Sequence, residues 1–209
     1  LKFKKYFKDY DFHNLYKELL NFCTVDLSSF YFDIRKDVLY CDPKDSEKRA
    51  STLLLLNIIL NSLLKWFAPI LSFTTEEIYQ LVSKKYKSIH LEKFLDFPKK
   101  FENGRIEKKW DELIKIRDIC NISIEEKRAS KEIGSSLEAE LQIKLNNKFE
   151  QIVNGIDLSE LCITSKAEVN FTDQADVDVV TKKSSVKKFS VCWKIRQDPC
   201  ERHPKCQII

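Results

Sequence analysis

The last residues of the chain include three cysteines and a histidine at the spacing of a metal site. Cys200, His203 and Cys206 follow one another at intervals of three, and Cys192 lies eight positions before Cys200. Three thiolates and one imidazole are a permitted tetrahedral set for Zn²⁺. The spacing predicts a zinc knuckle whose metal bonds would fold a segment too short to bury a core. The alternative left open is a group of free cysteines near the end of the chain.

The same segment is the basic part of the chain. Thr181–Ile209 carries eight lysine or arginine side chains against two carboxylates, whereas the net charge of the whole chain is only +4. The basic side chains are those of Lys182, Lys183, Lys187, Lys188, Lys194, Arg196, Arg202 and Lys205. Trp193 stands among them, and an exposed Trp can stack on an unpaired base while the cations hold phosphates. This pattern indicates an RNA partner, with a solvated surface and a packed Trp193 as the alternative.

Nothing in the sequence indicates a self-contained catalytic site. Three dispersed glycines cannot build a phosphate-binding loop. His13, His90 and His203 are far apart, and none has an obvious nucleophile to serve.

Hydrophobic periodicity predicts helices through most of the first 130 residues. The expected helices are 11–35, a helix capped by Asp45 or Ser46 that ends before Pro69, a helix capped at Thr74 or Thr75 that runs to Tyr86, and 105–128. Residues 36–43 and 87–104 are expected to be loops. The apolar stretch 53–73 is broken by polar residues such as Asn57 and Lys65, so we interpret it as a buried helix of a soluble bundle rather than a membrane span.

The pattern changes near Gly134. Residues 137–145 alternate as a half-buried strand does, 147–156 suggest a short helix, and 161–171 and 177–181 suggest further strands. The expected fold is mainly α: an antiparallel helical bundle (residues 1–133), a small α+β junction module (134–186) and a short zinc-knuckle-like tail (187–209). Cys23, Cys41, Cys120 and Cys162 are expected to be core residues in a reducing compartment, since no leader sequence is visible.

Three segments then resemble a known family. Asn21–Cys41, Trp66–Glu77 and Lys131–Ala139 resemble, in order and spacing, the anticodon-binding helical domain and following junction of bacterial isoleucyl-tRNA synthetases, class I aminoacyl-tRNA synthetases. The second segment is shared with valyl and leucyl enzymes, whereas the first and third are more particular to the isoleucyl enzyme. The resemblance covers essentially the whole chain.

The resemblance also implies a C-terminal zinc module of the form C-x2-C-W … C-x2-C. Cys192-Trp193 matches the second cysteine and its tryptophan, and Cys206 matches the first cysteine of the second pair. Phe189 and Ile209 occupy the places of the other two cysteines, so zinc would need a rearranged set that includes Cys200 and His203. In the family this tryptophan lies near the anticodon, which makes Trp193 the best-supported RNA contact.

The family's HIGH and KMSKS catalytic loops and its editing domain are not in this sequence. The resemblance therefore implies the C-terminal portion of a cytoplasmic, monomeric ligase, which binds tRNA(Ile) and works with the rest of the synthetase chain. ATP and Mg²⁺ would belong to the missing catalytic domain, and no membrane is expected. Two alternatives stay open: a helical protein-interaction module, or the equivalent region of a valyl enzyme.

Overall fold

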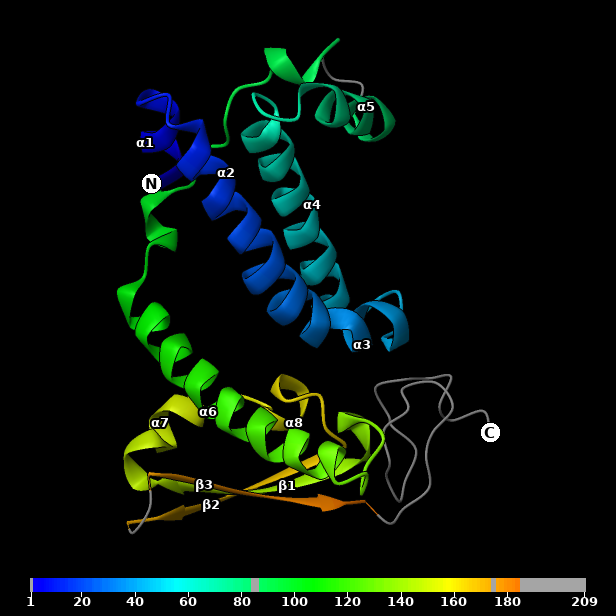
Figure 1. Ribbon diagram of the computed structural model, residues 1–209, viewed down its shortest axis with the longest axis vertical. Helices are drawn as coiled ribbons and strands as arrows, with labels where there is room; N and C mark the ends of the chain where they lie inside the picture. Colours follow the sequence, from blue (N-terminus) through cyan, green and yellow to red (C-terminus); the bar gives the residue numbers. More distant parts are fainter. Residues whose placement is uncertain (1, 84–86, 174–175, 185–209) are drawn as a thin grey trace. The chain divides into compact units, whose positions relative to one another are not determined.

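The computed structural model describes residues 2–83, 87–173 and 176–184, and the chain divides into two compact units, residues 1–99 and 100–209. The described part is mainly helical with one small sheet, as expected (Figure 1). The predicted division at 133/134 and 186/187 stays a prediction.

The first unit is helical. Its elements are α1 (Lys2–Lys8), α2 (Phe12–Asn21), a π-helix (Phe22–Phe32), α3 (Asp33–Cys41), α4 (Glu47–Phe67), α5 (Ser72–Val82) and a 3₁₀ turn (Ile89–Leu91). A further 3₁₀ turn (Lys99–Phe101) lies at the division between the units. Trp66, near the end of α4, contacts two aromatic rings: the ring centroids of Phe3 and Phe22 lie 4.9 and 6.5 Å from that of Trp66.

The expected loop at 36–43 is wrong, because helix continues through α3 to Cys41. Ile34 and Val38 are one helical turn apart and both are buried, so packing extends the helix beyond the predicted end. The helix stops where Asp42, the residue before Pro43, takes extended backbone with ψ 148°.

The predicted cap of α4 is confirmed at Ser46, whose hydroxyl accepts a hydrogen bond from the Arg49 N–H at 3.3 Å. The predicted cap of α5 is wrong. That helix begins at Ser72, and Thr75 lies inside it, donating its hydroxyl proton to the Leu71 carbonyl at 2.9 Å.

The burial expected for the leucines of α4 is found near its C-terminal end, and in the N-terminal half the buried residue is Thr52. Leu64 and Lys65 are buried, whereas Leu53, Leu54 and Leu55 are 41–62% exposed. Among the described residues, α4 alone is long and apolar enough to cross a membrane by length and composition, with a mean hydropathy of 1.4 and 22% of the tested window buried. This is weak evidence for a span, because an apolar helix of a soluble protein passes the same test.

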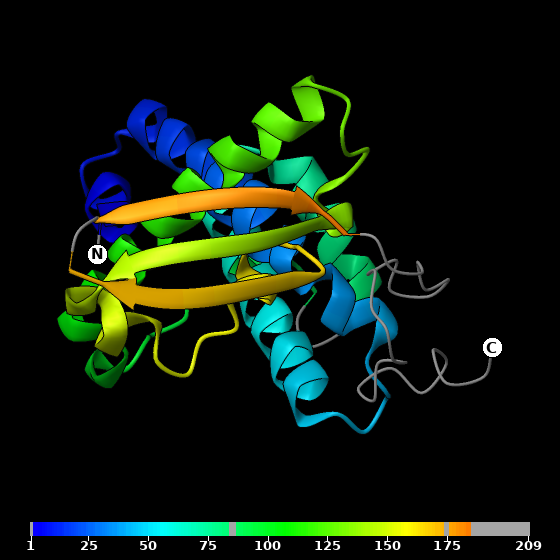
Figure 2. The same cartoon turned by 90° about the horizontal axis from the view of Figure 1, so that it is seen from below.

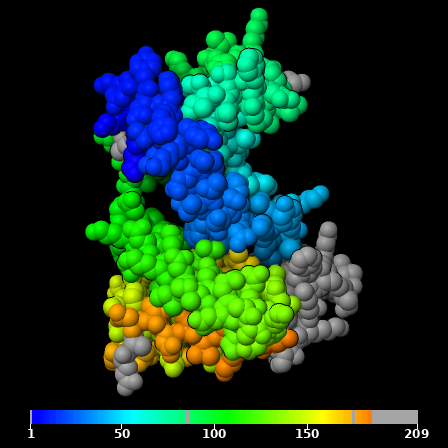
Figure 3. Space-filling model, viewed as in Figure 1, coloured from blue at the N-terminus to red at the C-terminus, as the bar shows by residue number. Residues whose placement is uncertain are grey.

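Like α4, α2 carries partly exposed apolar side chains. Phe12, Tyr16 and Leu20, spaced four residues apart, are each 38–46% exposed. In the space-filling view α2 (blue) is open on the face shown (Figure 3).

The second unit places helices on one face of a three-stranded sheet. Its elements are α6 (Gly104–Ala129), a 3₁₀ turn (Ser136–Glu138), β1 (Ala139–Asn146), a 3₁₀ turn (Asn147–Phe149), α7 (Glu150–Val153), α8 (Leu158–Leu161), β2 (Lys166–Thr172) and β3 (Val177–Lys183). The strand order is β2-β1-β3, with β1 parallel to β2 and antiparallel to β3. The expected strand over 161–171 begins only at Lys166, because Asp157 caps the short α8 through the N–H groups of Ser159 and Glu160.

The core of this unit lies between α6 and the sheet. Leu113, Ile116, Cys120 and Ile124 on α6 are buried, as are Leu141, Ile143 and Leu145 on β1. Ile106 lies on the same face of α6 by helical spacing, seven residues before Leu113, but it is 53% exposed. Figure 2 shows the opposite face of the sheet, which no described segment of the unit covers. The alternate residues of β1 on that face are polar: Glu140, Gln142, Lys144 and Asn146.

Candidate nucleic-acid interface

Most of the predicted site residues lie outside the described residues. This applies to the zinc set Cys192, Cys200, His203 and Cys206, and to Trp193, Lys187, Lys188, Lys194, Arg196, Arg202 and Lys205. Within residues 2–83, 87–173 and 176–184, no group of three or more His, Cys, Asp or Glu side chains could hold a metal ion. The described basic residues of the predicted set are Lys182 and Lys183, both on β3.

These two lysines lie on opposite faces of the sheet. Lys182 is paired in register with Glu140, and Lys183 with the fully buried Ala139. Since side chains alternate along a strand, Lys183 is on the face that packs against α6, and Lys182 is on the open face. The structure therefore separates two residues that the sequence grouped together.

The open face carries balanced charge. Lys166 pairs with Glu168 at 2.5 Å, and Lys144 pairs with Asp178 at 3.3 Å. The hydrogen bond and the charge from Lys166 hold the pKa of Glu168 below its usual value, with a smaller contribution from Lys182. These cations already have acidic partners, so this face is a poor surface for a polyanion.

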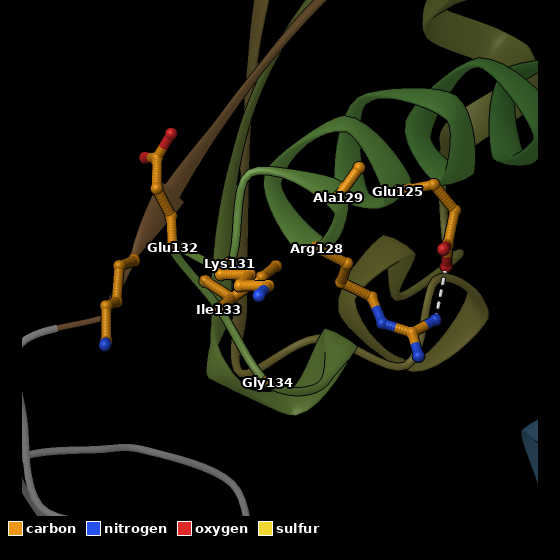
Figure 4. Close-up of a pocket in the computed structure, with 8 residues that line it drawn as sticks. Glu125, Arg128, Ala129, Lys131, Glu132, Ile133 and Gly134 are labelled. Atoms are coloured by element: carbon orange, nitrogen blue, oxygen red, sulfur yellow. Dashed lines mark hydrogen bonds and ion pairs between the residues drawn. The ribbon is translucent and has the colours of Figure 1, made fainter.

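Lys183 instead lines a cavity of about 550 Å³ where α6 ends. The other lining residues are Glu125, Arg128, Ala129, Lys131, Glu132, Ile133 and Gly134. In Figure 4 the carboxylate of Glu132 points away from Arg128, whose guanidinium faces Glu125. The cavity thus brings together cations from the end of a helix and the end of a strand.

The chain reversal after α6 makes this cavity. The N–H of Glu132 donates to the Lys127 carbonyl at 3.1 Å, and the N–H of Lys131 donates to the Arg128 carbonyl at 3.0 Å. This is the Schellman arrangement that ends many helices, and its left-handed position is usually glycine. Here Lys131 occupies that position, with φ 59°.

The segment that follows, part of the third family-like motif, fixes the entry into β1. The Gly134 N–H donates to the Glu138 carboxylate at 3.0 Å, and Ile133 is buried. Ala139 begins β1 with no exposed surface. We infer that Gly134–Ala139 has a structural role, whereas Arg128 and Lys131 beside it are interface candidates that the sequence reasoning missed. The signal was available as a basic last turn followed by a lysine at the helix end.

Two of the four described cysteines are core residues, as expected. Cys120 and Cys162 are buried, and their mutual hydrogen bond together with burial raises the pKa of the Cys162 thiol far above its usual range. Cys23 and Cys41 are only half-buried. Cys162 is therefore a neutral thiol, and the buried pair Cys120–Cys162 packs α6 against the end of α8.

Known proteins match this amino-acid sequence. A family model described as "Anticodon-binding domain of tRNA ligase" matches residues 1–144. The isoleucine–tRNA ligase of Pelagibacter ubique (strain HTCC1062) is 64% identical over 201 residues, which cover 96% of this chain and 22% of that protein.

More distant relatives agree. The isoleucine–tRNA ligase of Bartonella henselae is 34% identical over 203 residues, covering 92% of this chain and 21% of that protein. That of Methylacidiphilum infernorum is 36% identical over 213 residues, covering 98% and 23%. The chain thus spans about a fifth of the length of the curated relatives it matches.

Proposed function

Because the chain belongs to the family of anticodon-binding domains of tRNA ligases, we propose that it recognises the anticodon arm of tRNA(Ile) within an isoleucine–tRNA ligase. The observation that carries this proposal is the family match over residues 1–144, together with relatives that share the same ligase name. Three separate sequence segments had indicated the same family.

The whole ligase's activity is part of the proposal. An isoleucine–tRNA ligase attaches isoleucine to its tRNA with ATP, and this chain spans about a fifth of such proteins. We propose that the present residues supply tRNA binding and that the rest of the synthetase chain supplies the reaction. Binding energy gained at the anticodon would then orient the distant acceptor end for catalysis.

The chemistry of recognition follows from unpaired bases. Anticodon bases can be splayed out, stacked on aromatic rings and contacted at their edges. We propose Trp193 as a stacking residue. We propose as phosphate contacts Lys183 on β3 and the basic side chains of the tail, namely Lys187, Lys188, Lys194, Arg196 and Arg202. The sequence also proposed Lys182, but its place on the charge-balanced open face of the sheet supports it less than Lys183.

We further propose that Cys192, Cys200, His203 and Cys206 bind Zn²⁺. The metal would supply folding free energy to a short segment and hold Trp193 in place. Zinc analysis of the purified chain, with Cys206→Ser as the control, tests this: one equivalent that the substitution removes supports the site, and zinc-free protein contradicts it.

The alternative functions are less well supported. A protein-interaction module would not explain isoleucine–tRNA ligases as relatives, and neither would a valyl enzyme. We propose a monomeric, cytoplasmic protein without a membrane partner, as the relatives are translation enzymes.

The deciding experiment compares tRNA(Ile) and tRNA(Val) binding by the purified chain across salt concentrations. We expect salt-sensitive binding that favours tRNA(Ile). Trp193→Ala should weaken tRNA(Ile) binding about tenfold through the loss of one stacked base, while Trp193→Phe keeps a ring and most of the affinity. Equal affinity for both tRNAs, or binding insensitive to salt, would contradict the proposed function.

A further inference from the structure

The cavity at the end of α6 contains five ionisable side chains, of which the two carboxylates are already paired. Glu125 accepts from the Arg128 guanidinium at 2.6 Å. Glu132 accepts from the Lys127 ammonium at 2.9 Å and from the Ser130 hydroxyl at 3.0 Å. These bonds also hold the pKa of Glu132 below its usual value, so it stays ionised and occupied.

Two ammonium groups of the cavity have no carboxylate partner among the described residues. The side chains of Lys131 and Lys183 are exposed and make no ion pair or hydrogen bond with any other described residue. One comes from the turn after α6 and the other from the last residue of β3, so the fold brings them to the same cavity from separate parts of the chain.

The backbone carbonyl groups around the cavity are not left free to repel an anion. A helix C-terminus carries partial negative charge on its unpaired carbonyl groups. Here the carbonyls of Glu126, Lys127 and Arg128 accept from N–H groups of the turn. The last helical turn also carries the basic Lys127 and Arg128. An anion in the cavity would therefore meet cations rather than unpaired carbonyl oxygens.

The backbone of Lys131 is a second, independent observation. A residue with a Cβ at φ 59° is less stable than glycine would be, by about 1 kcal/mol. Glycine would complete the Schellman turn without that strain. Tyr10 and Ile163 share this left-handed backbone, and what distinguishes Lys131 is that its side chain lines the cavity where a capping glycine would place none.

We propose that this cavity binds a backbone phosphate of the RNA, through the ammonium groups of Lys131 and Lys183 with Arg128 beside them. The inference rests on the proposed function, which it deepens by naming a contact outside the C-terminal tail. A phosphodiester offers several acceptor oxygens and one negative charge, which suits two ammonium donors. The cavity of about 550 Å³ is large enough to admit a phosphate group.

The test measures tRNA(Ile) binding by single variants of the whole chain between about 50 and about 500 mM KCl. Lys131→Gln and Lys183→Gln should each weaken binding about five- to tenfold near 0.1 M salt and lower the slope of log affinity against log salt by about 0.7–0.9. Lys183→Arg should keep most of the affinity. Lys182→Gln is the matched control, because it removes the same charge from the next residue on the opposite face, and its affinity should stay within about twofold.

Lys131→Gly separates a binding role from a structural one. It removes the ammonium and relieves the left-handed strain, so we expect a higher melting temperature together with weaker tRNA binding. If Lys131→Gly is more stable and binds tRNA(Ile) as tightly as the unaltered chain does, the proposal is wrong.

The remaining outcomes are also decisive. If the unaltered chain binds tRNA(Ile) with salt dependence but Lys183→Gln and Lys182→Gln reduce the affinity equally, the phosphate site is wrong and the proposed function stands. If the unaltered chain does not prefer tRNA(Ile), the proposed function itself fails. Titration with millimolar inorganic phosphate should give no saturable binding, and saturable binding that Lys183→Gln abolishes would assign the site to free phosphate instead.

Discussion

At the scale of single residues, the first unit contains a buried ion pair. The Lys65 ammonium lies 3.2 Å from the Glu92 carboxylate, and the two side chains are 8% and 11% exposed. The Tyr79 hydroxyl donates to the same carboxylate at 3.1 Å. Apolar residues surround this group, including Leu64, Ala68 and Ile89. The pair ties the segment after α5 back to the end of α4.

Removing one partner of this pair should cost more than removing both. Lys65→Met leaves a buried carboxylate without its ammonium partner, and we expect it to lower the free energy of unfolding by about 3 kcal/mol. Lys65→Met combined with Glu92→Leu should recover much of that loss, since no buried charge is left over. Urea unfolding followed by circular dichroism measures both. A double variant as unstable as the sum of the two single variants would contradict this interpretation.

In the same region, the hydrogen bonds of Glu76 should make a contribution to stability that is lost in acid. Hydrogen bonds from the side chains of Gln80 and Ser88 and from the Ile89 N–H hold the pKa of this carboxyl below its usual value of 4.5. A carboxyl with a lowered pKa in the folded state stabilises the fold fully above pH 4.5 and loses that effect as pH falls through the lowered pKa.

Glu76→Gln should therefore be less stable than the unaltered chain at pH 7, and the two should converge below pH 4.5. Urea midpoints measured from pH 7 to acid give the comparison. Glu77→Gln is the control, because Glu77 is an exposed neighbour on the same helix. A constant difference between Glu76→Gln and the unaltered chain at every pH would argue against the pKa explanation.

At the scale of elements, the start of a helix can be tested by its cap. Ser46→Ala removes the hydroxyl that accepts from the Arg49 N–H, and we expect a loss of about 1 kcal/mol in thermal or urea unfolding. Thr74→Ala should change stability by less than about 0.5 kcal/mol, because Thr74 is an exposed residue inside α5 rather than its cap. Comparable losses from both substitutions would contradict the helix starts described above.

The elements that local patterns could predict are those where propensity and packing agree. The predicted cap of α4 and the hydrophobic periodicity of α4 and α6 gave the bounds of both helices to within a residue or two. The predicted start of α5 was wrong because threonine hydroxyls can either cap a helix or bond to a carbonyl inside it. The sequence Thr-Thr-Glu-Glu is compatible with both positions. Residues 161–165 were read as strand because short apolar runs do not distinguish a strand from one helical turn.

In the candidate interface, too, local sequence predicted some features, and the others depend on the tertiary fold. Sequence could identify a basic region but not its faces, because whether Lys182 or Lys183 faces α6 depends on a register set by β1. The cavity was not predictable at all, since Lys131 and Lys183 meet only through the tertiary fold. The signal that could be read locally was the turn after α6, where Lys131 stands in place of a capping glycine.

At the scale of the whole molecule, net charge is confined to one end. Residues 185–209 carry six basic and two acidic side chains, so residues 1–184 carry thirty of each and are neutral overall. A chain that ends at Ser184 keeps the matched residues 1–144 and the cavity at α6 but loses the six basic side chains of the tail. We expect its tRNA affinity to fall and its salt slope to drop by several units, about 0.7–0.9 for each phosphate that the tail would otherwise neutralise.

The same truncation should leave the secondary structure intact, because β3 ends at Lys183 and its pairing with β1 is complete by then. Far-ultraviolet circular dichroism checks the fold, and fluorescence anisotropy checks the binding. An unchanged salt slope would show that the tail does not bind phosphates.

The π-helix between α2 and α3 has a consequence for how the chain can evolve. A π-helix bonds residue i to residue i+5, so each residue turns the chain by about 80°, and deleting one residue from Phe22–Phe32 would rotate α3 about its axis by nearly a quarter turn relative to α2. Ile34 and Val38 would then leave the buried side of their unit. Substitutions that keep the length would avoid this rotation. We therefore expect insertions and deletions to be excluded from this segment during divergence and to accumulate in loops such as 93–98, where no buried helix depends on the residue count.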